Sequence, residues 1–259
     1  MKKPLVSIVT PSYNQAQFLE RTICSVLDQD YPHIEYLIVD GGSTDGSVEI
    51  IKRFAPKLGW WTSEPDYGQT EAINKGFTQA RGQIFAWLNS DDTYLPNAVS
   101  EAVAYLQANP EVGMVYGDAN FIDEQDRLIG KFPARQTDLK KLQRGYVHIP
   151  QQAVFFRAEL WKRVGPLDSS FYFAMDYDLW VRLAKISKLQ YFPHTWANFR
   201  LHLGAKTIQS DEQCWPEMLR VHYREGGSWF SVIVFKYWLR KMVAPLINWH
   251  RQRMFKKLA

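Results

Sequence analysis

The first hundred residues alternate between short apolar runs and longer segments in which apolar residues recur at helical spacing. Runs rich in β-branched and aromatic residues predict strands at Leu5–Thr10, Glu35–Asp40, Trp60–Thr62 and Ile84–Leu88. The helical spacing predicts helices over Gln17–Gln29, through Ile51 and Phe54, over Gln69–Ala80 and from Pro96 onward. Strands and helices that alternate at these lengths indicate an α/β fold with a mostly parallel sheet.

The second half of the chain is less regular. Strands are expected at Met114–Tyr116, Ala119–Ile122 and Gln152–Arg157, and helices at Ala158–Val164 and Asp176–Lys185. A chain of 259 residues is long enough for one large α/β domain, alone or with an appendage.

Three polar clusters follow predicted strands, at Thr10–Asn14, Asp40–Ser43 and Asn89–Asp92. In open α/β sheets, ligands bind outside the carboxyl ends of the strands. We therefore expect these clusters to meet at one edge of the sheet and to form a binding site there.

The cluster Asn89-Ser90-Asp91-Asp92 places two carboxylates in one turn. Adjacent carboxylates repel each other unless a cation or a basic group lies near. Hard divalent ions take oxygen ligands and often join one or two carboxylates to a phosphate, so a metal site is one hypothesis. In the alternative hypothesis, Asp91 or Asp92 caps the helix that follows Pro96.

Asp40 ends a predicted strand and precedes two glycines. A carboxylate at this place can accept hydrogen bonds from a ribose hydroxyl or a base N–H, or it can serve only to shape a turn. The loop matches neither GxGxxG nor the P-loop pattern, which disfavours dinucleotide binding and ATP hydrolysis.

Composition indicates the compartment. Cys24 and Cys214 form no CxxC pair and no zinc spacing, which favours a reduced, cytosolic protein. The apolar run Leu5–Thr10 is shorter than the core of a signal peptide, so we interpret it as a buried strand.

The net charge of +4 is distributed unevenly. Residues 229–259 hold seven Lys and Arg residues and no Asp or Glu, which leaves residues 1–228 mildly acidic. Such asymmetry indicates a partner for the basic segment. Apolar residues recur there at helical spacing, namely Phe235, Trp238, Leu239, Met242, Val243, Leu246 and Ile247.

The basic tail at 229–259 contains no apolar stretch near the length of about 20 residues that a membrane-spanning helix needs. Basic residues mixed with Trp and Phe favour a helix lying on an anionic membrane surface, where each Lys or Arg contributes about 1 kcal/mol. The alternative is a helix packed on the body of the protein or on a second copy in a homodimer.

Several ordered segments resemble the family 2 glycosyltransferases with the GT-A fold, of the bacterial cell-envelope or exopolysaccharide type. The segments are Val9–Asn14, Val39–Ser47, Asp66–Gly76, Ala86–Asp92, Ile149–Ala153 and Ala174–Trp180. The resemblance spans residues 4–207. It implies a Rossmann-like, mostly parallel central sheet with helices on both faces. The charge and the apolar spacing described above add a basic amphipathic helical tail after it.

The resemblance also implies a site for a nucleotide diphosphate sugar, with uracil as the expected base. Pro11, Tyr13 and Asp40 would hold the nucleoside, with Asp40 on the base. The rest of the donor pocket would be lined by Gln69, Lys75, Ser90 and Lys206, the lysines offsetting phosphate charge.

In the same resemblance, Asn89 and Asp91 occupy the DxD positions of the family. Asn89 replaces the more usual first Asp, so it would hydrogen-bond the ribose rather than bind a metal. Asp91, together with His202, would bind Mn²⁺ or Mg²⁺.

The family's Glu-Asp pair is here Met175-Asp176, so the resemblance assigns the role of general base to Asp176. A positioned carboxylate that removes the acceptor proton typically contributes about 10²–10⁴-fold. Asp178 competes for this role, although its spacing from Arg182 also fits a structural helical pair. Gln152 and Asp178 are expected to contact the acceptor.

The sequence thus predicts an inverting glycosyltransferase that uses a divalent metal and acts in polysaccharide biosynthesis. Its acceptor would be a glycan or a lipid-linked sugar at the cytoplasmic face of the cell membrane. We expect a GT-A domain at 1–207, with a donor half at 1–110 and an acceptor half at 111–207, and a helical extension at 208–259.

Two alternatives belong to other functional classes. A nucleotidyltransferase would also place acidic metal ligands on an α/β sheet, but the chain has no Gly-rich basic loop after the first strand. A non-enzymatic membrane- or nucleic-acid-binding module would use the basic tail, but the acidic body and the strand-end carboxylates disfavour it. We therefore expect no nucleic-acid partner.

Overall fold

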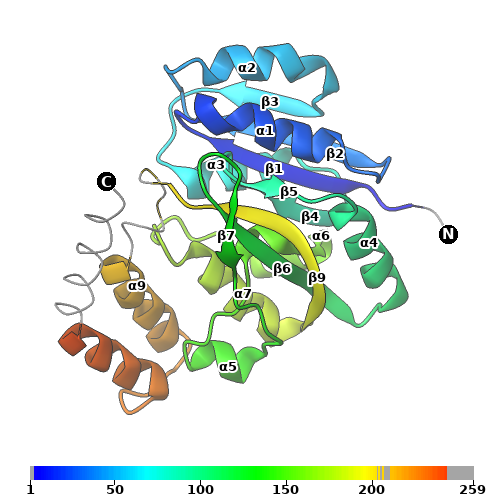
Figure 1. Cartoon of the computed structure of the whole chain (residues 1–259). Coiled ribbons are helices and arrows are strands. Elements are labelled where there is room, and N and C mark those ends of the chain that lie inside the picture. The colour runs from blue at the N-terminus through cyan, green and yellow to red at the C-terminus, as the bar shows by residue number, and fades with distance from the viewer. Residues whose placement is uncertain (1–2, 203, 205, 207–210, 244–259) are drawn as a thin grey trace.

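The computed structural model describes residues 3–202, 204, 206 and 211–243. Within these residues, nine strands form one sheet in the order β3-β2-β1-β4-β8-β6-β9-β5, and β7 pairs with β6 (Figure 1). The predicted α/β class is confirmed.

The first half of the chain builds a parallel part of the sheet. Its elements are β1 (Val6–Ser12), α1 (Ala16–Leu27), β2 (Ile34–Asp40), α2 (Ser47–Phe54), η1 (Ala55–Lys57), β3 (Trp60–Ser63), α3 (Gln69–Gln79) and β4 (Ile84–Trp87). Strand β1 pairs in parallel with both β2 and β4, and β2 pairs in parallel with β3. The predicted order of strands and helices in this half is therefore confirmed.

The second half makes the sheet mixed. Its elements are β5 (Thr93–Tyr94), α4 (Ala98–Ala108), β6 (Val112–Ile122), β7 (Leu128–Lys131), α5 (Leu139–Gln143), η2 (Gln151–Ala153), β8 (Val154–Arg157), α6 (Ala158–Val164), α7 (Met175–Ile186), β9 (Lys188–Arg200) and α9 (Asp211–Arg224). Strand β8 runs antiparallel to β4 and β6, whereas β6 and β9 are parallel.

The two strands predicted at Met114–Tyr116 and Ala119–Ile122 are one strand, β6. Gly117 interrupts the apolar pattern, yet it continues the strand because its missing side chain lets β9 approach. A Cβ at Gly117 would lie 2.6 Å from the carbonyl oxygen of His194 and 2.7 Å from the Trp196 ring. Glycine inside a strand often marks such a close approach.

Among the elements of the described residues, β5, β7, β9 and α5 were not predicted from the sequence, nor were the short helical turns η1 and η2. Among them β9 matters most for the site, because it connects α7 to the segment that carries His202. Strand β5 is only two residues long and pairs with β9 through Thr93 and Asn198.

Helices cover both faces of the sheet, as expected. On one face, side chains of α1, α2 and α4 pack with Ile8, Ile38 and Ala86 of the strands. On the other, α3, α6 and α7 pack with Val9, Val39 and Trp87. Neighbouring strand residues thus point into different apolar layers, which explains why these strands are almost continuously apolar.

Parallel register brings three strand ends to one edge. Ser12 at the end of β1 pairs with Asp40, and Asp40 pairs with Ser63 at the end of β3. Val9 pairs with Trp87, two residues before Asn89. The expected convergence of the three polar clusters at the carboxyl edge is confirmed.

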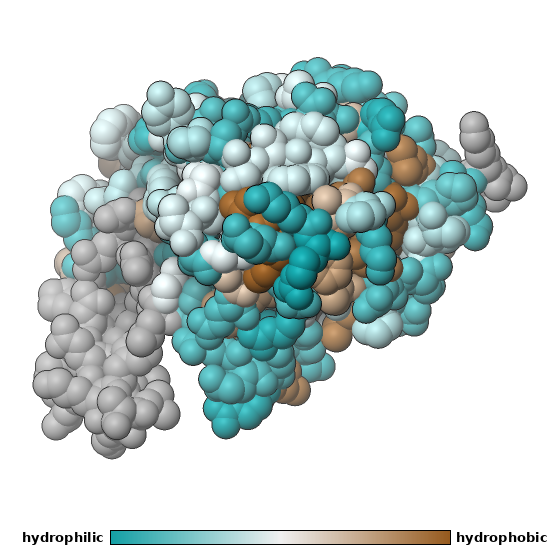
Figure 2. Space-filling view, turned by 90° about the horizontal axis from the view of Figure 1, so that it is seen from above, coloured by the Kyte–Doolittle hydropathy of each residue, from teal (hydrophilic) through white to brown (hydrophobic). Residues whose placement is uncertain are grey.

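Residues 232–243 form a helix, so this part of the predicted tail helix is confirmed. Residues 244–259 of the predicted tail lie outside the described part. None of the described helices combines the length and the apolar character that crossing a membrane requires. Figure 2 shows a largely hydrophilic face on which apolar side chains gather only in smaller patches.

Candidate active site

The loop after β4 places Asn89 at the centre of a hydrogen-bonded network. The Asn89 Oδ1 accepts a hydrogen bond from Nε2 of Gln69 at 2.6 Å. The Asn89 Nδ2 donates to Oδ2 of Asp92 at 3.2 Å and to Oε1 of Gln151 at 3.3 Å. Asn89 therefore joins α3, its own loop and η2.

Lys206 extends this network. Its Nζ donates to Oε1 of Gln69 at 3.1 Å and lies 3.8 Å from the centre of the Tyr172 ring. Burial lowers the pKa of Lys206 from 10.5 to about 8, and the opposing charges of Asp176 and Glu217 limit the shift. Near neutral pH the side chain is thus mostly a cation beside Gln69.

Asp91 and His202 form the second part of the site. The Asp91 Oδ2 lies 3.0 Å from Nε2 of His202, and both side chains are largely buried. The His202 ring packs on Phe18 of α1, with 4.8 Å between the ring centres. This packing directs the imidazole toward the Asn89–Asp92 loop.

Arg200 binds the Asn89–Asp92 loop through two hydrogen bonds. Its backbone N–H donates to Oδ1 of Asp92 at 2.9 Å, and its Nε donates to the carbonyl oxygen of Asp91 at 2.8 Å. Burial and the neighbouring charge of Asp91 raise the pKa of Asp92 well above 3.8. Asp92 is completely buried, so it orients the loop and is not presented to a ligand.

Neither Asp91 nor Asp92 caps the helix that follows Pro96. Helix α4 begins after Asn97, and no side chain caps it. Ser90 lies in the same loop, where its carbonyl oxygen accepts a hydrogen bond from Oγ1 of Thr22 at 2.9 Å.

The implied metal fits these residues as a partial ligand set. Asp91 offers one carboxylate oxygen and His202 one imidazole nitrogen, 3.0 Å apart. In the part of the chain that the structure describes, no group of three or more His, Cys, Asp or Glu could hold a metal ion. Asp91 and His202 would hold such an ion only together with oxygen ligands from a diphosphate and water, and the imidazole nitrogen would favour Mn²⁺ over Mg²⁺.

At the end of β2, the carboxylate of Asp40 accepts hydrogen bonds from neighbouring residues of the chain. Its Oδ2 accepts from the backbone N–H groups of Gly42 and Ser43 and from Oγ of Ser63, and its Oδ1 accepts from Oγ of Ser43 at 2.6 Å. The side chain has no exposed surface. Asp40 therefore shapes the loop, which is the turn role weighed from the sequence.

Asp66 is a further carboxylate at this end that sequence reasoning did not select. A Cβ at Gly41 would lie 3.1 Å from both carboxylate oxygens of Asp66, so only glycine lets them approach the loop this closely. Burial raises the pKa of Asp66, and the charges of Glu71 and Asp40 add to the shift. Its place three residues after the end of β3, in the segment that resembles the family, was the available signal.

The remaining nucleoside-side residues lie around this loop. Pro11 is buried in β1, while Tyr13 is 62% exposed just beyond the strand end. Lys75 of α3 forms an ion pair with Glu64 at 3.0 Å, so the ammonium group already has an anionic partner.

Asp176 is the second residue of α7 and is half-buried. Burial raises its pKa above 3.8, while the Tyr177 N–H and the Lys206 charge oppose the rise. A raised pKa and a nearby cation are typical of a carboxylate that exchanges protons.

Asp178 lies on another side of the same helix. Its side chain is completely buried, where one oxygen contacts Arg182 and the other contacts Arg224. The structure therefore places Asp178 in the structural role and does not bring it to an acceptor.

Gln152 is also buried, with 3% of its surface exposed. Its neighbour Gln151 joins the site instead, because its Nε2 donates to the carbonyl oxygen of Trp87 at 2.8 Å while its Oε1 accepts from Asn89. The expected acceptor contact by Gln152 is thus not supported, because the turn of η2 directs the preceding side chain to the site.

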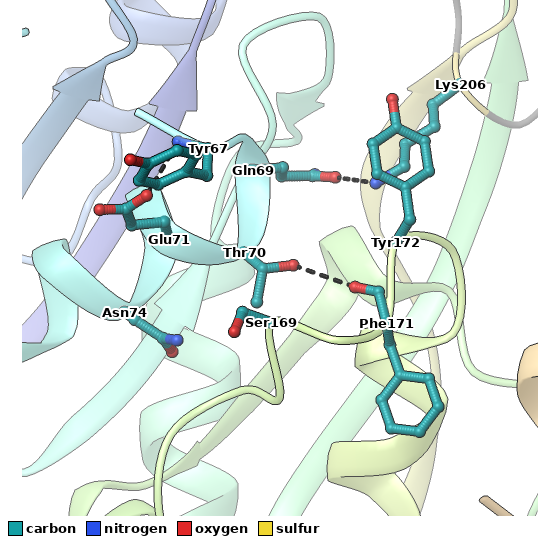
Figure 3. A pocket seen from close by; sticks show the side chains of 9 residues that line it. All are labelled: Tyr67, Gln69, Thr70, Glu71, Asn74, Ser169, Phe171, Tyr172 and Lys206. Carbon is teal, nitrogen blue, oxygen red and sulfur yellow. Dashed lines mark hydrogen bonds between the residues drawn. The ribbon is translucent and has the colours of Figure 1, made fainter. Parts of the chain in front are cut away.

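A pocket of about 380 Å³ opens between α3 and the loop that precedes α7 (Figure 3). Lys206 and Gln69 meet across one end of it, and Thr70 points to the carbonyl oxygen of Phe171. The lining residues are Tyr67, Gln69, Thr70, Glu71, Asn74, Ser169, Phe171, Tyr172 and Lys206. This mixture of aromatic rings and polar groups suits a sugar, whose C–H faces are apolar and whose hydroxyls form hydrogen bonds.

Comparison with known protein sequences also indicates a glycosyltransferase. Residues 7–164 match the sequence model of the family described as glycosyl transferase family 2. An uncharacterized glycosyltransferase of Mycobacterium tuberculosis is 34% identical over 188 residues, covering 71% of this chain and 70% of the relative. One of Rickettsia typhi is 30% identical over 199 residues, covering 74% and 62%.

Solved structures share the fold. TarS 1–349 of S. aureus in complex with UDP-GlcNAc superposes with a TM-score of 0.70 at 16% identity, covering 84% of this chain and 65% of that one. The mannosyltransferase PcManGT of Pyrobaculum calidifontis in complex with GDP-Man and Mn²⁺ superposes with a TM-score of 0.66 at 20% identity, covering 93% and 71%.

The family match covers more than half of the chain, and the relatives are named as glycosyltransferases. These findings favour a glycosyltransferase over the nucleotidyltransferase and the binding module. The chain belongs to glycosyl transferase family 2 and is a glycosyltransferase with the GT-A fold.

Proposed function

We propose that this enzyme transfers a sugar from a nucleotide diphosphate sugar to an acceptor hydroxyl with inversion at the anomeric carbon. One observation carries the proposal: the Asp91–His202 pair, the Gln69–Lys206 pair and Asp176 converge beyond the carboxyl edge of the sheet. These are an anionic metal ligand set, a cation and a candidate base within one site.

The donor nucleoside would lie over the loop at the ends of β1 and β2, against Pro11 and Tyr13. Asp40 would hold the loop in shape, and Asp66 would offer the carboxylate that faces the base. UDP-GlcNAc and GDP-Man occupy fold neighbours of this chain, and the sequence resemblance favours a UDP-sugar.

The diphosphate would lie between Asp91 and Lys206, with Asn89 and Ser90 on the ribose side and Lys75 at the rim. A divalent ion held by Asp91 and His202 would supply charge neutralisation to the leaving diphosphate when bound. Lys206 would add positive charge from the opposite side, since Gln69 fixes its ammonium group.

Asp176 would remove the proton from the acceptor hydroxyl. The acceptor oxygen then forms a bond to the anomeric carbon from the side opposite the diphosphate, and the diphosphate leaves with the electron pair. Because bond formation and departure occur on opposite sides of that carbon, its configuration inverts. A carboxylate with a raised pKa holds the proton better than an ordinary one, which favours this step.

The pocket beside Tyr172 would receive the acceptor sugar, since Gln152 and Asp178 are buried. In this proposal, residues 1–110 form the donor half and residues 111–207 the acceptor half. The acceptor class that we propose is a growing glycan or a lipid-linked sugar of the cell envelope.

Membrane proximity would bring the enzyme to such an acceptor. Around the helix at 232–243, large apolar side chains are exposed, with Trp229 at 74%, Phe230 at 100% and Phe235 at 68%. Residues 229–259 are also free of acidic residues. We propose that this segment lies on an anionic membrane surface at the inner face of the membrane; a second copy of the chain is the competing occupant.

A thermal-shift screen tests the donor proposal. Purified protein is heated with UDP, GDP, UDP-GlcNAc or GDP-Man, each with and without Mn²⁺. A ligand at 100 times its Kd stabilises the folded state by about 2.7 kcal/mol, which gives a clear shift. The proposal expects a shift that depends on Mn²⁺, whereas the absence of a shift with all of these ligands would count strongly against it.

A further inference from the structure

Helix α9 lies outside the residues that match the family model, yet it is built into the enzyme. The match ends at residue 164, and α9 spans Asp211–Arg224. Met218 and Val221 are buried in the same apolar layer as α7. The helix is therefore part of the folded body, and its polar residues on that side face the segment that leads into α7.

Glu217 of α9 binds the backbone immediately before α7. Its Oε1 accepts a hydrogen bond from the N–H of Tyr172 at 3.0 Å, and its Oε2 accepts from the N–H groups of Phe173 at 2.7 Å and Ala174 at 2.8 Å. Successive backbone N–H groups that point to one anion form a concave anion site, and here the anion is a side chain of the same chain.

The three amides that Glu217 binds lie just before the start of α7. Ala174 is the residue just before the first residue of α7, and Asp176 is the second residue of that helix. The N–H of the N-cap residue, here Ala174, has no partner inside the helix, and a negative charge is favoured at this end. Glu217 therefore fixes where α7 begins and how Asp176 is presented.

The same segment is held from the opposite side by α3. Oγ1 of Thr70 contacts the carbonyl oxygen of Phe171 at 3.4 Å, a contact drawn in Figure 3, and lies 2.8 Å from Sδ of Met175. Tyr172, between these points, carries the ring over which the Lys206 amine lies. Residues 171–175 are thus fixed between α3, whose first residue Gln69 contacts Asn89, and α9.

We propose that Glu217 is a positioning residue for the transfer reaction, which makes α9 part of the catalytic unit rather than of a separate extension. It acts through the backbone of 172–174, on Asp176 in one direction and on Tyr172 with Lys206 in the other. This role rests on the proposed function of Asp176. The hydrogen bonds of Glu217 themselves do not depend on that function.

Two substitutions separate positioning from general stability. Glu217→Ala removes both acceptor oxygens. Glu217→Gln keeps one oxygen, which can still accept from Phe173 and Ala174, but it turns an NH2 group toward the N–H of Tyr172 and so retains only part of the contact. Glu159→Ala is the matched control, because Glu159 is an exposed carboxylate in the first turn of another helix, α6.

The first readout is hydrogen exchange of the amides of residues 172–174 in the full-length protein without ligand. We expect faster exchange in Glu217→Ala, a smaller change in Glu217→Gln and none in Glu159→Ala. Unchanged exchange in Glu217→Ala would overturn the proposal, because Glu217 would then not hold the amides of residues 172–174.

The second readout is the release of UDP or GDP from UDP-GlcNAc or GDP-Man with Mn²⁺, where water replaces the acceptor. Misplacing a reacting group costs about 10- to 100-fold in rate, so kcat should fall by that factor in Glu217→Ala. The kcat of Glu217→Gln should lie between those of the wild type and Glu217→Ala. The KM for the donor should change less than kcat does, because Lys206 keeps its hydrogen bond to Gln69 even where Tyr172 shifts.

Faster exchange with unchanged kcat would also overturn the proposal, because Glu217 would then serve the fold alone. If the wild-type chain releases nucleotide from neither donor, the proposed function fails. The exchange experiment would in that case still show whether Glu217 holds residues 172–174.

Discussion

Nε2 of His202 lies 3.0 Å from Oδ2 of Asp91, although 111 residues separate them in the chain. Asp91 follows β4 in the first half of the chain, whereas His202 follows β9 in the second half. The pairing of β9 with β5 brings the two loops together. The pair that we propose as metal ligands therefore forms only when both halves have folded against each other.

Replacement of Asp91 should remove metal-dependent donor binding. Asp91→Ala takes away the carboxylate oxygen of the pair, and His202→Ala takes away the nitrogen. We expect more than about 100-fold weaker Mn²⁺-dependent binding of UDP in Asp91→Ala and about 10- to 100-fold in His202→Ala. Isothermal titration with and without Mn²⁺ measures both; equal binding by wild type and Asp91→Ala would contradict the assignment.

The two acidic residues of α7 should respond in opposite ways. Asp176→Asn should lower turnover by about 10²–10⁴-fold while donor binding and thermal stability stay close to wild type. Asp178→Asn should cost about 3 kcal/mol of stability, since it leaves the side chains of Arg182 and Arg224 facing a buried neutral group. Urea unfolding and turnover measured on both proteins decide the matter; full turnover in Asp176→Asn would eliminate it as the base.

Turnover should follow a bell-shaped pH profile. Asp176 must be ionised to accept a proton, so the rate rises as pH passes its pKa, which burial raises above 3.8. Lys206 must be charged, so the rate falls as pH rises through its pKa of about 8. Lys206→Met should lower the rate and remove the alkaline limb; an unchanged alkaline limb in that variant would mean that another group causes it.

Arg200 should stabilise the loop that carries Asp91. The side chain is completely buried and donates to the carbonyl oxygens of Asp91 and Asp123. Arg200→Met leaves these acceptors without a donor, and we expect a loss of about 3 kcal/mol in urea unfolding.

Arg127→Met is the control for Arg200→Met. Arg127 belongs to the turn between β6 and β7, and its side chain is 74% exposed where it pairs with Asp123. Exposed ion pairs contribute little to stability, so this variant should unfold close to wild type. Similar losses in the two variants would refute a special role for Arg200.

The exposed apolar residues near 232–243 should mediate binding to anionic vesicles. The double variant Phe235→Ser, Trp238→Ser removes two exposed rings, 68% and 55% accessible, and should weaken co-sedimentation with phosphatidylglycerol vesicles. Leu128→Ser, which removes one apolar side chain of β7 that is 63% exposed, should not. Unchanged binding in the double variant would leave the homodimer as the occupant to test.

The amino-acid sequence determined the first half of the fold and the place of the site. Apolar runs that end at Thr10, Asp40 and Leu88 predicted parallel strands, and parallel strands place their carboxyl ends at one edge. The clusters around Asn14, Asp40 and Asn89 follow from that rule without any further contact. Spacing along the chain was sufficient because these strands are short, buried and joined by helices.

Only the tertiary structure decided which side chains of the second half reach the site. Periodicity could not choose between Asp176 and Asp178, because the packing partners Arg182 and Arg224 determine which one is buried. The same holds for Gln151 and Gln152, which differ by one residue of a short helical turn. Strand β9 has no clear alternation, so the positions of Arg200 and His202 depended on its pairing with β5 and β6.

The contribution of α9 was also beyond the sequence. Nothing in the spacing of residues 211–224 shows that Glu217 meets the amides of 172–174, because a hydrogen bond across 43 to 45 residues depends on how two helices pack. Local preferences of the chain define strands, helices and polar ends. Contacts between distant segments, formed only when the apolar layers close, bring together the Asp91–His202 pair that we propose as metal ligands, the proposed base Asp176 and the helix that we propose to position it.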